Sequence, residues 1–237
     1  MAGSKILVLG GTGPAGICLL RELVYRKHAV VVYARTPSKI PKELADNSLI
    51  EIVKGEMNDT SAFSIAMAQC SIVLSLLGPQ ITDKGVGATF YVDMYKNTVI
   101  PAMRQHGVRR IVLMGTVSIK RPEDHWTAFQ TMVTVFMRLL AASLYRNITG
   151  IADLFDSEAN DLDWTIFRIA QIPGENDEAS WLKGREDGKV YNGWVGAKGW
   201  TSSINRSALA RWLVDAAEGG ANDWVRKMPA VGKLAGS

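Results

Sequence analysis

The sequence predicts an α/β domain with a doubly wound parallel sheet, and three observations support this prediction. Apolar runs of strand length alternate with helical patterns along the chain. The first run, Lys5–Leu9, leads through a glycine-rich turn directly into a helix. The 237 residues are enough for one large domain with a well-buried core. We therefore expect a single domain over residues 1–237, with a small excursion on the substrate side over about 173–204.

Composition and charge limit the classes of partner. The net charge of +4 comes without any block of Lys and Arg, so no nucleic-acid partner is expected. The two cysteines, Cys18 and Cys70, lie in apolar contexts that predict buried free thiols in a reducing compartment. The most apolar later stretch, Met132–Leu144, is interrupted by Arg138 and is too short to span a membrane. We expect a cytoplasmic protein without a membrane partner and without a metal site.

The glycine turn after the first strand carries the main functional signal. Gly10, Gly13 and Gly16 recur at a spacing of three, and a helical pattern runs over Pro14–Arg26. The first glycine permits the tight turn, the second lets a pyrophosphate approach the backbone, and the third lets the helix pack closely. The N–H groups and dipole of the first helical turn then favour an anion. A glycine turn that serves packing alone is the alternative.

The second strand, Ala29–Ala34, is followed by a basic residue where a site for NAD carries an acid. Asp or Glu at this point accepts hydrogen bonds from the ribose hydroxyls. Arg35 stands there instead, and Lys39 follows within the same segment. A guanidinium suits a 2′-phosphate, so the sequence favours NADPH over NADH. The alternative is that Arg35 is a solvated residue at the end of a strand.

The third and fourth strands complete the predicted cofactor site. After strand Leu49–Val53, Glu56 or Met57 is placed to contact the adenine, and Asp59 is expected to cap helix Thr60–Gln69. Strand Ser71–Leu77 ends near the point where strand order reverses, which is where ligands bind in such sheets. Its terminal backbone, Leu76, Leu77 and Gly78, should line the nicotinamide ribose. The polar segment Gln80–Gly87 is either a mobile loop over the site or an ordinary surface loop.

The second half of the chain continues the alternation of strands and helices. We expect helix Phe90–His106, kinked or ended by Pro101 and stopped by Gly107; strand Arg109–Met114; helix Trp126–Tyr145; helix Ile151–Asn160; strand Asp163–Ile169; a short strand near Val190–Asn192; and helix Asn205–Ala217, followed by a tail with one edge strand.

Two hydroxyl residues are the candidates for chemistry. Thr116 and Ser118 follow the fifth strand, at the edge of the sheet where a substrate carbonyl is expected, so either hydroxyl could polarise it. The competing interpretation is turn chemistry, because Thr and Ser commonly bond the backbone at such points. The apolar stripe of helix Trp126–Tyr145 is wide enough to reach a substrate cavity or a subunit contact, which would make the protein a homodimer.

Several motifs together resemble one family. These are G-G-T-G-P-A-G after the first strand, Arg35 after the second, G-E-M after the third and L-D-W-T-I-F-R at the sixth. In these the chain resembles the atypical short-chain dehydrogenase/reductases with a Rossmann-type fold, of the NAD(P)H-binding, NmrA-like type. It is most similar there to the subgroup of biliverdin reductase B, which is flavin reductase-like.

The resemblance, which covers about residues 4–217, implies the sheet order 3-2-1-4-5-6-7 and NADPH in an extended pose. It also implies roles for individual residues. Gly10, Thr12, Gly13, Pro14 and Ala15 would hold the pyrophosphate, Arg35 the 2′-phosphate, Glu56 and Met57 the adenine, Leu76, Leu77 and Gly78 the ribose, and Gln171 would lie near the nicotinamide.

The sequence departs from the family at three points. Glu56 stands where the family usually has Asp, and Ile169 replaces an expected proline. The Tyr-x-x-x-Lys catalytic pair of the wider superfamily is absent: Tyr145 is followed by Thr149, and no lysine lies between Lys120 and Lys183. Positioning of cofactor and acceptor can support hydride transfer without that pair.

Three functional hypotheses follow. The first is an NADPH-dependent reductase of a hydrophobic or aromatic small molecule, as in secondary metabolism. The second is a non-redox isomerase or cyclase that uses the same pocket. The third is a regulator that senses the dinucleotide, as NmrA-like proteins can. The missing pair motivates the second and third, because a shared fold is no proof of a shared reaction.

Overall fold

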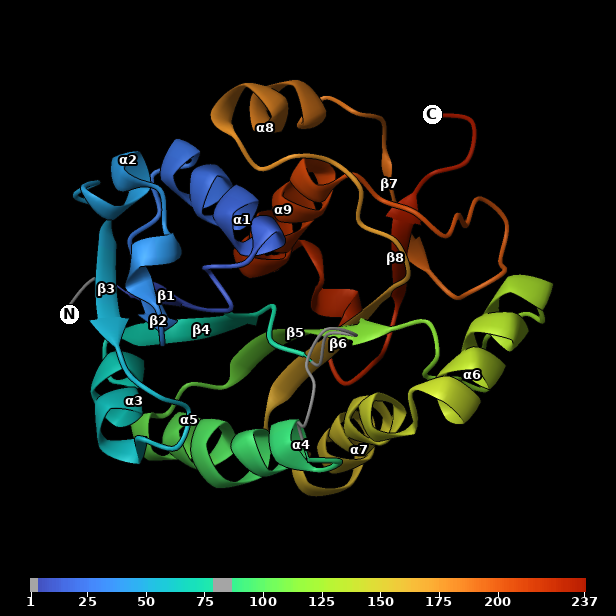
Figure 1. Cartoon of the computed structure of the whole chain (residues 1–237), viewed down its shortest axis with the longest axis horizontal. Helices are drawn as coiled ribbons and strands as arrows, with labels where there is room; N and C mark the ends of the chain where they lie inside the picture. The colour runs from blue at the N-terminus through green and yellow to red at the C-terminus, as the bar shows by residue number, and fades with distance from the viewer. Residues whose placement is uncertain (1–3, 79–86) are drawn as a thin grey trace.

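A computed structural model describes residues 4–78 and 87–237 (Figure 1). Its central feature is an eight-stranded sheet in the order β3-β2-β1-β4-β5-β6-β8-β7. All neighbouring pairs are parallel except the β7–β8 pair. The strands are β1 Lys5–Leu9, β2 Val30–Ala34, β3 Ile50–Lys54, β4 Cys70–Ser75, β5 Arg110–Thr116, β6 Asp163–Ile169, β7 Val190–Gly193 and β8 Ala230–Lys233.

Helices cover both faces of the sheet, as the predicted doubly wound α/β class requires. Figure 1 shows α1, α2, α8 and α9 on one face and α3, α4, α5 and α7 on the other. Each face has its own apolar core, because the central strands carry large apolar side chains on both sides. The α-helices are α1 Pro14–Tyr25, α2 Lys42–Ala45, α3 Thr60–Met67, α4 Phe90–Met94, α5 Ile100–His106, α6 Ala128–Leu140, α7 Ala142–Glu158, α8 Glu178–Gly184 and α9 Arg206–Asp215.

The far end of the sheet differs from the order implied by the resemblance. The first six positions agree, but the next neighbour of β6 is β8, which joins it through the Arg168–Ala230 pair. The tail strand was expected at the edge, and that expectation is wrong: β7 is the edge, antiparallel to β8 over Val190–Gly193. The segment 173–204 on the substrate side therefore returns to the sheet and forms its edge strand, β7. It also contains α8, a helix that was not expected from the sequence.

The helix after β4 is continuous over the predicted range but changes its winding. Between α4 and α5 lies a π-helical segment, Tyr95–Val99, and Pro101 follows in the first turn of α5. Proline lacks the N–H needed inside a helix, so the wider turn before it accommodates the missing donor. Gly107 ends the helix in a left-handed conformation, with φ of 68°.

The expected helix Trp126–Tyr145 is wrong as a single element. The chain breaks at Ala141, whose φ of −137° and ψ of 42° lie outside the helical region, so α6 ends at Leu140 and α7 begins at Ala142. The second helix then runs without interruption through the start expected at Ile151. In the described ranges no single helix is long and apolar enough to span a membrane; α6 and α7 pass that test only as a pair, bent by 117°.

Both cysteines are free thiols, as the sequence predicts, but the expectation that both are buried is wrong for Cys70. Cys18 is fully buried on α1, whereas Cys70 at the start of β4 is partly exposed. Burial raises the pKa of the Cys18 thiol to about 11 and that of Cys70 to about 12. Both side chains are therefore protonated and unreactive at neutral pH.

Candidate functional site

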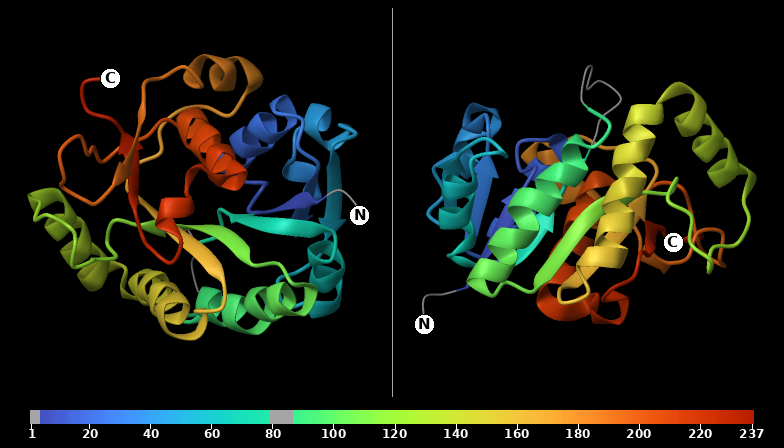
Figure 2. Two further views of the ribbon diagram at one scale, coloured as in Figure 1. Left: turned by 180° about the vertical axis from the view of Figure 1, so that it is seen from behind. Right: turned by 90° about the horizontal axis from the view of Figure 1, so that it is seen from below.

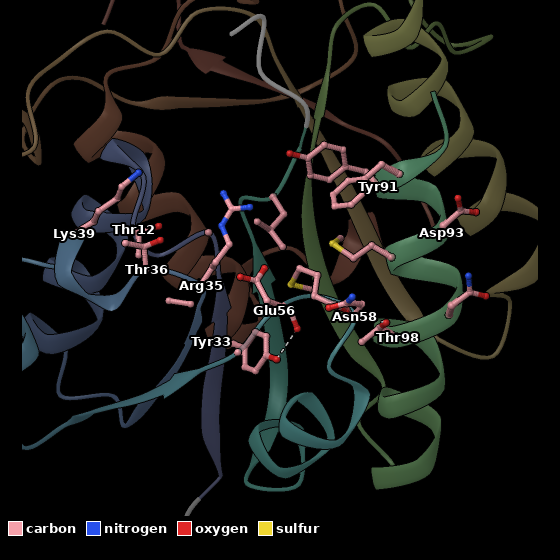
Figure 3. A pocket seen from close by; sticks show the side chains of 18 residues that line it. Thr12, Tyr33, Arg35, Thr36, Lys39, Glu56, Asn58, Tyr91, Asp93 and Thr98 are labelled. Atoms are coloured by element: carbon pink, nitrogen blue, oxygen red, sulfur yellow. Dashed lines mark hydrogen bonds between the residues drawn. The ribbon is translucent and has the colours of Figure 1, made fainter. Parts of the chain in front are cut away.

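A cavity of about 550 Å³ opens at the carboxyl ends of β1 to β4, where a doubly wound sheet binds its ligands (Figure 3). Its walls come from the glycine turn, from the segments after β2 and β3, and from α4 with the π-helical segment. The predicted cofactor residues that line it are Gly10, Thr12, Arg35, Lys39, Glu56, Met57 and Leu77.

The glycine turn is shaped as a cradle for an anion. Gly10 has φ of 80°, which only glycine adopts readily. A Cβ on Gly16 would lie 2.7 Å from the Gly11 Cα, so the helix could not pack this closely on the turn with any other residue. A Cβ on Gly13, by contrast, would meet nothing nearer than the Gly10 carbonyl oxygen, at 3.6 Å. The space above Gly13 is therefore open to a ligand.

The first turn of α1 is ready to bind a negative group. Its N-cap is Gly13, no side chain of the described residues caps it, and the turn carries no acidic residue. Pro14 occupies the first helical position, where a missing N–H costs nothing. The remaining N–H groups and the helix dipole favour an anion at this end. The residues present thus fit a dinucleotide pyrophosphate.

Two cations stand on the rim of the cavity beyond the turn. Arg35 follows β2 directly, and Lys39 lies at the end of the short 3₁₀ turn Pro37–Lys39. Both side chains are exposed, and neither forms an ion pair with any other residue that the structure describes. Unpaired cations at this place suit the additional phosphate of NADP better than a bare ribose.

The loop after β3 is held in place by two hydroxyl groups. The Tyr33 hydroxyl donates to the Glu56 carbonyl over 2.8 Å, and the Thr98 hydroxyl donates to the Met57 carbonyl over 3.1 Å. Burial, with the nearby acidic residues Asp59 and Glu56, raises the pKa of Tyr33 to about 12, so it remains a donor at neutral pH. These contacts position Glu56 and Met57 at the cavity. Asp59 caps α3 as expected, accepting from the Ala62 N–H over 3.0 Å.

The opposite wall comes from residues that were not singled out from the sequence. Phe90, Tyr91, Asp93 and Met94 on α4, with Asn97 on the π-helical segment, line the cavity. Figure 3 shows Tyr91 on the wall opposite Arg35. One signal for them was available: the helix that follows the fourth strand must begin above the point where strand order reverses. The predicted loop Gln80–Gly87 precedes it, and its residues 80–86 lie outside the described part of the chain.

The proposed chemical residues lie at the end of β5. The Thr116 and Ser118 hydroxyls are 2.6 Å apart, and the Ser118 N–H also donates to the Thr116 oxygen over 3.3 Å. Ser118 is fully buried, whereas Thr116 borders a small apolar cavity of about 30 Å³ that Gly78 also lines. Of the two hydroxyl residues, only Thr116 lines this cavity.

Some predicted cofactor residues lie outside both cavities. Gln171, at the end of β6, is exposed, and its backbone pairs with Ser203. Leu76 continues β4, with its N–H donating to the Leu9 carbonyl over 2.9 Å, and forms the backbone against which Gly10 packs. Gly13, the N-cap of α1, and Pro14 and Ala15 in its first turn also line neither of these cavities.

A buried ion pair fixes the segment that carries Ser118. Arg168 on β6 makes a bidentate contact with Asp124, at 2.6 and 2.7 Å, and also donates to the Ile119 carbonyl over 2.8 Å. Burial alone would raise the pKa of Asp124, but the hydrogen bonds and charge of Arg168 outweigh it and lower the pKa. The same carboxylate accepts from the Gln130 side chain and the Val195 N–H. Sequence reasoning missed this pair, because its partners are 44 residues apart.

Comparisons with known proteins agree with this geometry. Residues 10–219 match the model of a family described as NAD(P)H-binding. A wide-type short-chain dehydrogenase/reductase from Veillonella parvula, solved in complex with NADP, superposes with a TM-score of 0.74 at 16% identity, over 98% of this chain and 95% of that one. ChuY, an anaerobillin reductase from Escherichia coli O157:H7, gives 0.69 at 15% identity, over 99% of each chain. The oxidoreductase ylbE from Lactococcus lactis gives 0.67 at 17%, over 97% and 90%. At these identities the structures show a shared fold.

Proposed function

The chain belongs to this NAD(P)H-binding family, and we propose that it is an NADPH-dependent reductase of a hydrophobic small molecule. One observation carries the cofactor choice: Arg35 and Lys39, both without ion pairs in the part of the chain described, occupy the rim where a site for NAD would need an acid. The NADP complex of the Veillonella protein and the reductase ChuY, which share this fold, support the same class.

In this proposal, different residues of the chain bind different parts of the cofactor. The α1 N-terminus and the space above Gly13 receive the pyrophosphate, and Arg35 with Lys39 receives the 2′-phosphate. The apolar side chains of Met57, Leu77 and Met94 exclude water from the cavity. The bound nicotinamide supplies a hydride, and the protein fixes the distance and direction of its transfer.

In this proposal, the Thr116 hydroxyl donates a hydrogen bond to the oxygen of the acceptor. Because the Ser118 hydroxyl and N–H can both donate to the Thr116 oxygen, the Thr116 proton is free to be donated onward. A donor aimed at an oxygen that gains charge stabilises the transition state more than the ground state. No Tyr-x-x-x-Lys pair serves this purpose, since Thr149 stands where the lysine would follow Tyr145.

The direct test is turnover. We expect the purified protein to consume NADPH, followed by its near-ultraviolet absorbance, with at least one acceptor from a panel of quinones, flavins and enones. Thr116→Val should lower kcat by about a hundredfold, the typical loss of one oxyanion donor. Thr116→Ser, which keeps the hydroxyl, is the matched control. If no acceptor is reduced while a substrate is converted without nucleotide, the non-redox alternative replaces the proposal.

A further inference from the structure

Helix α6 presents an apolar face that nothing in the described chain covers. On one side of the helix, Gln130, Thr134 and Met137 are buried against the body of the molecule. On the other side lie large apolar side chains at helical spacing, and about half or more of the surface of each is exposed. With their exposed fractions, these are Met132 62%, Val135 49%, Phe136 48%, Leu139 75% and Leu140 75%, joined by Trp126 at 79% just before the helix.

The exposed side chains form one continuous stripe. Positions 132, 135, 136, 139 and 140 follow the i, i+3, i+4, i+7, i+8 pattern of a single helical face. Figures 1 and 2 show α6 at the periphery of the molecule, with its outer side away from every other element. The apolar stripe therefore faces away from the body of the molecule, and an exposed apolar patch of this kind marks a contact surface.

Charge identifies what covers this face. From His125 to Ala152 the sequence contains no Asp or Glu, whereas it contains Arg138 and Arg146. Both arginines are exposed, and neither forms an ion pair with a described residue; Arg138 instead packs on the Tyr145 ring. A second copy packed stripe against stripe would bring the same two arginines to the contact and no acid from residues 125–152. An anionic lipid surface offers both the apolar phase and the opposite charge.

We propose that α6 docks the protein on anionic membranes, lying in the interface without spanning it. Trp126 suits the headgroup boundary, the stripe enters the outer acyl region, and Arg138 and Arg146 reach the lipid phosphates. The bend of 117° before α7 keeps the rest of the molecule above the surface. This proposal replaces the expectation of a protein without a membrane partner, and it does not depend on the proposed reductase activity.

Vesicle binding tests the proposal. The full-length protein is sedimented with phosphatidylcholine vesicles that contain roughly a third phosphatidylserine, and with phosphatidylcholine vesicles alone. We expect binding to the first, weakened by salt, and at least tenfold less binding to the second. Leu139→Gln with Leu140→Gln should lower binding to the anionic vesicles by at least tenfold, and Arg138→Gln with Arg146→Gln should remove the preference for them.

Matched controls distinguish vesicle binding through the α6 stripe from binding through any exposed apolar side chain. Ile65→Gln on α3, at 65% exposure, and Leu182→Gln on α8, at 54%, remove exposed apolar side chains elsewhere and should leave binding unchanged. All these positions are exposed, so circular dichroism should show folded variants. Absence of binding to anionic vesicles overturns the proposal, as does equal binding by the α6 variant. A wild-type dimer that the α6 variant converts to a monomer, without vesicle binding, would assign the stripe to a second copy instead.

Discussion

Gly13 and Gly16 look alike in the motif, but their surroundings require glycine for different reasons. At Gly16 a Cβ would collide with the backbone of Gly11, so the requirement lies in packing. At Gly13 a Cβ would be tolerated by the protein and would fill the space left for a ligand. The spacing of glycines predicts the turn, but only the built geometry separates these two roles.

Two substitutions test this distinction. Gly16→Ala should destabilise the fold by about 1–3 kcal/mol, the usual cost of overpacking, as measured by urea unfolding. Gly13→Ala should leave the unfolding free energy of the free protein nearly unchanged and weaken NADPH binding by tenfold or more. The interpretation is wrong if Gly13→Ala destabilises as much as Gly16→Ala, or if it binds NADPH as tightly as the wild type.

At the scale of elements, the sequence was informative where a local rule sets the structure. The strands of the first half, the cap by Asp59 and the end of a helix at Gly107 all follow from local chemistry. The break at Ala141 has no such signal, because neither Gly nor Pro is near it and the flanking residues favour a helix. Packing of α7 on the sheet and of α6 on the loop around Val195 sets the bend.

The site also contains residues that local sequence rules predict and residues that only the tertiary fold brings together. The residues on β-strand ends could be predicted, because the carboxyl ends of parallel strands share one edge. The far wall could not be assigned in full, since ordinary helical spacing does not carry from α4 across the π-helical segment to Asn97 and Thr98. The Asp124–Arg168 pair joins a loop to a strand, and only the fold brings them together.

This pair allows a prediction about stability. Asp124→Asn leaves the buried Arg168 charge without its partner and should cost about 3–5 kcal/mol in urea unfolding at neutral pH. Asp156→Asn, which removes the partly exposed partner of Arg121, should cost about 1 kcal/mol or less and is the control.

The pair also predicts how stability depends on pH. The pKa of Asp124 is lower in the folded protein than in the unfolded chain, where an aspartate titrates near about 3.9. The contribution of the Asp124 carboxylate to the free energy of unfolding is therefore fully present above that pH. It is lost as the pH falls through the pKa that Asp124 has in the folded protein. Asp124→Asn should flatten the acid limb of the unfolding free energy, measured from neutral pH to about pH 3. An acid limb as steep as that of the wild type would contradict this role.

For the whole molecule, the important connection is between the cofactor helix and the substrate-side segment. Glu22 on α1 is fully buried and binds Arg185 just after α8 through both carboxylate oxygens, at 2.6 and 3.0 Å. Arg21, one residue earlier, donates to the Asn176 carbonyl over 3.1 Å. The substrate-side segment is thus anchored to α1, the helix whose N-terminus would bind the pyrophosphate.

Hydrogen exchange tests this connection. Glu22→Gln should accelerate amide exchange over residues 173–188 by about tenfold or more, because the segment loses its charged anchor while the sheet is kept. Glu186→Gln removes an exposed carboxylate from the same segment, where it forms no ion pair with a described residue, and should leave exchange unchanged. Equal exchange in both variants would show that the segment is held by other contacts.

The central claim is that the N-terminus of α1 and Arg35 together select a phosphorylated dinucleotide. Isothermal titration of NADPH and NADH into the wild type and Arg35→Ala measures this directly. We predict that the wild type binds NADPH more tightly than NADH, and that the variant loses about 1–3 kcal/mol toward NADPH with little change toward NADH. Equal affinity for the two nucleotides in the wild type, or unchanged NADPH binding by the variant, would contradict the account.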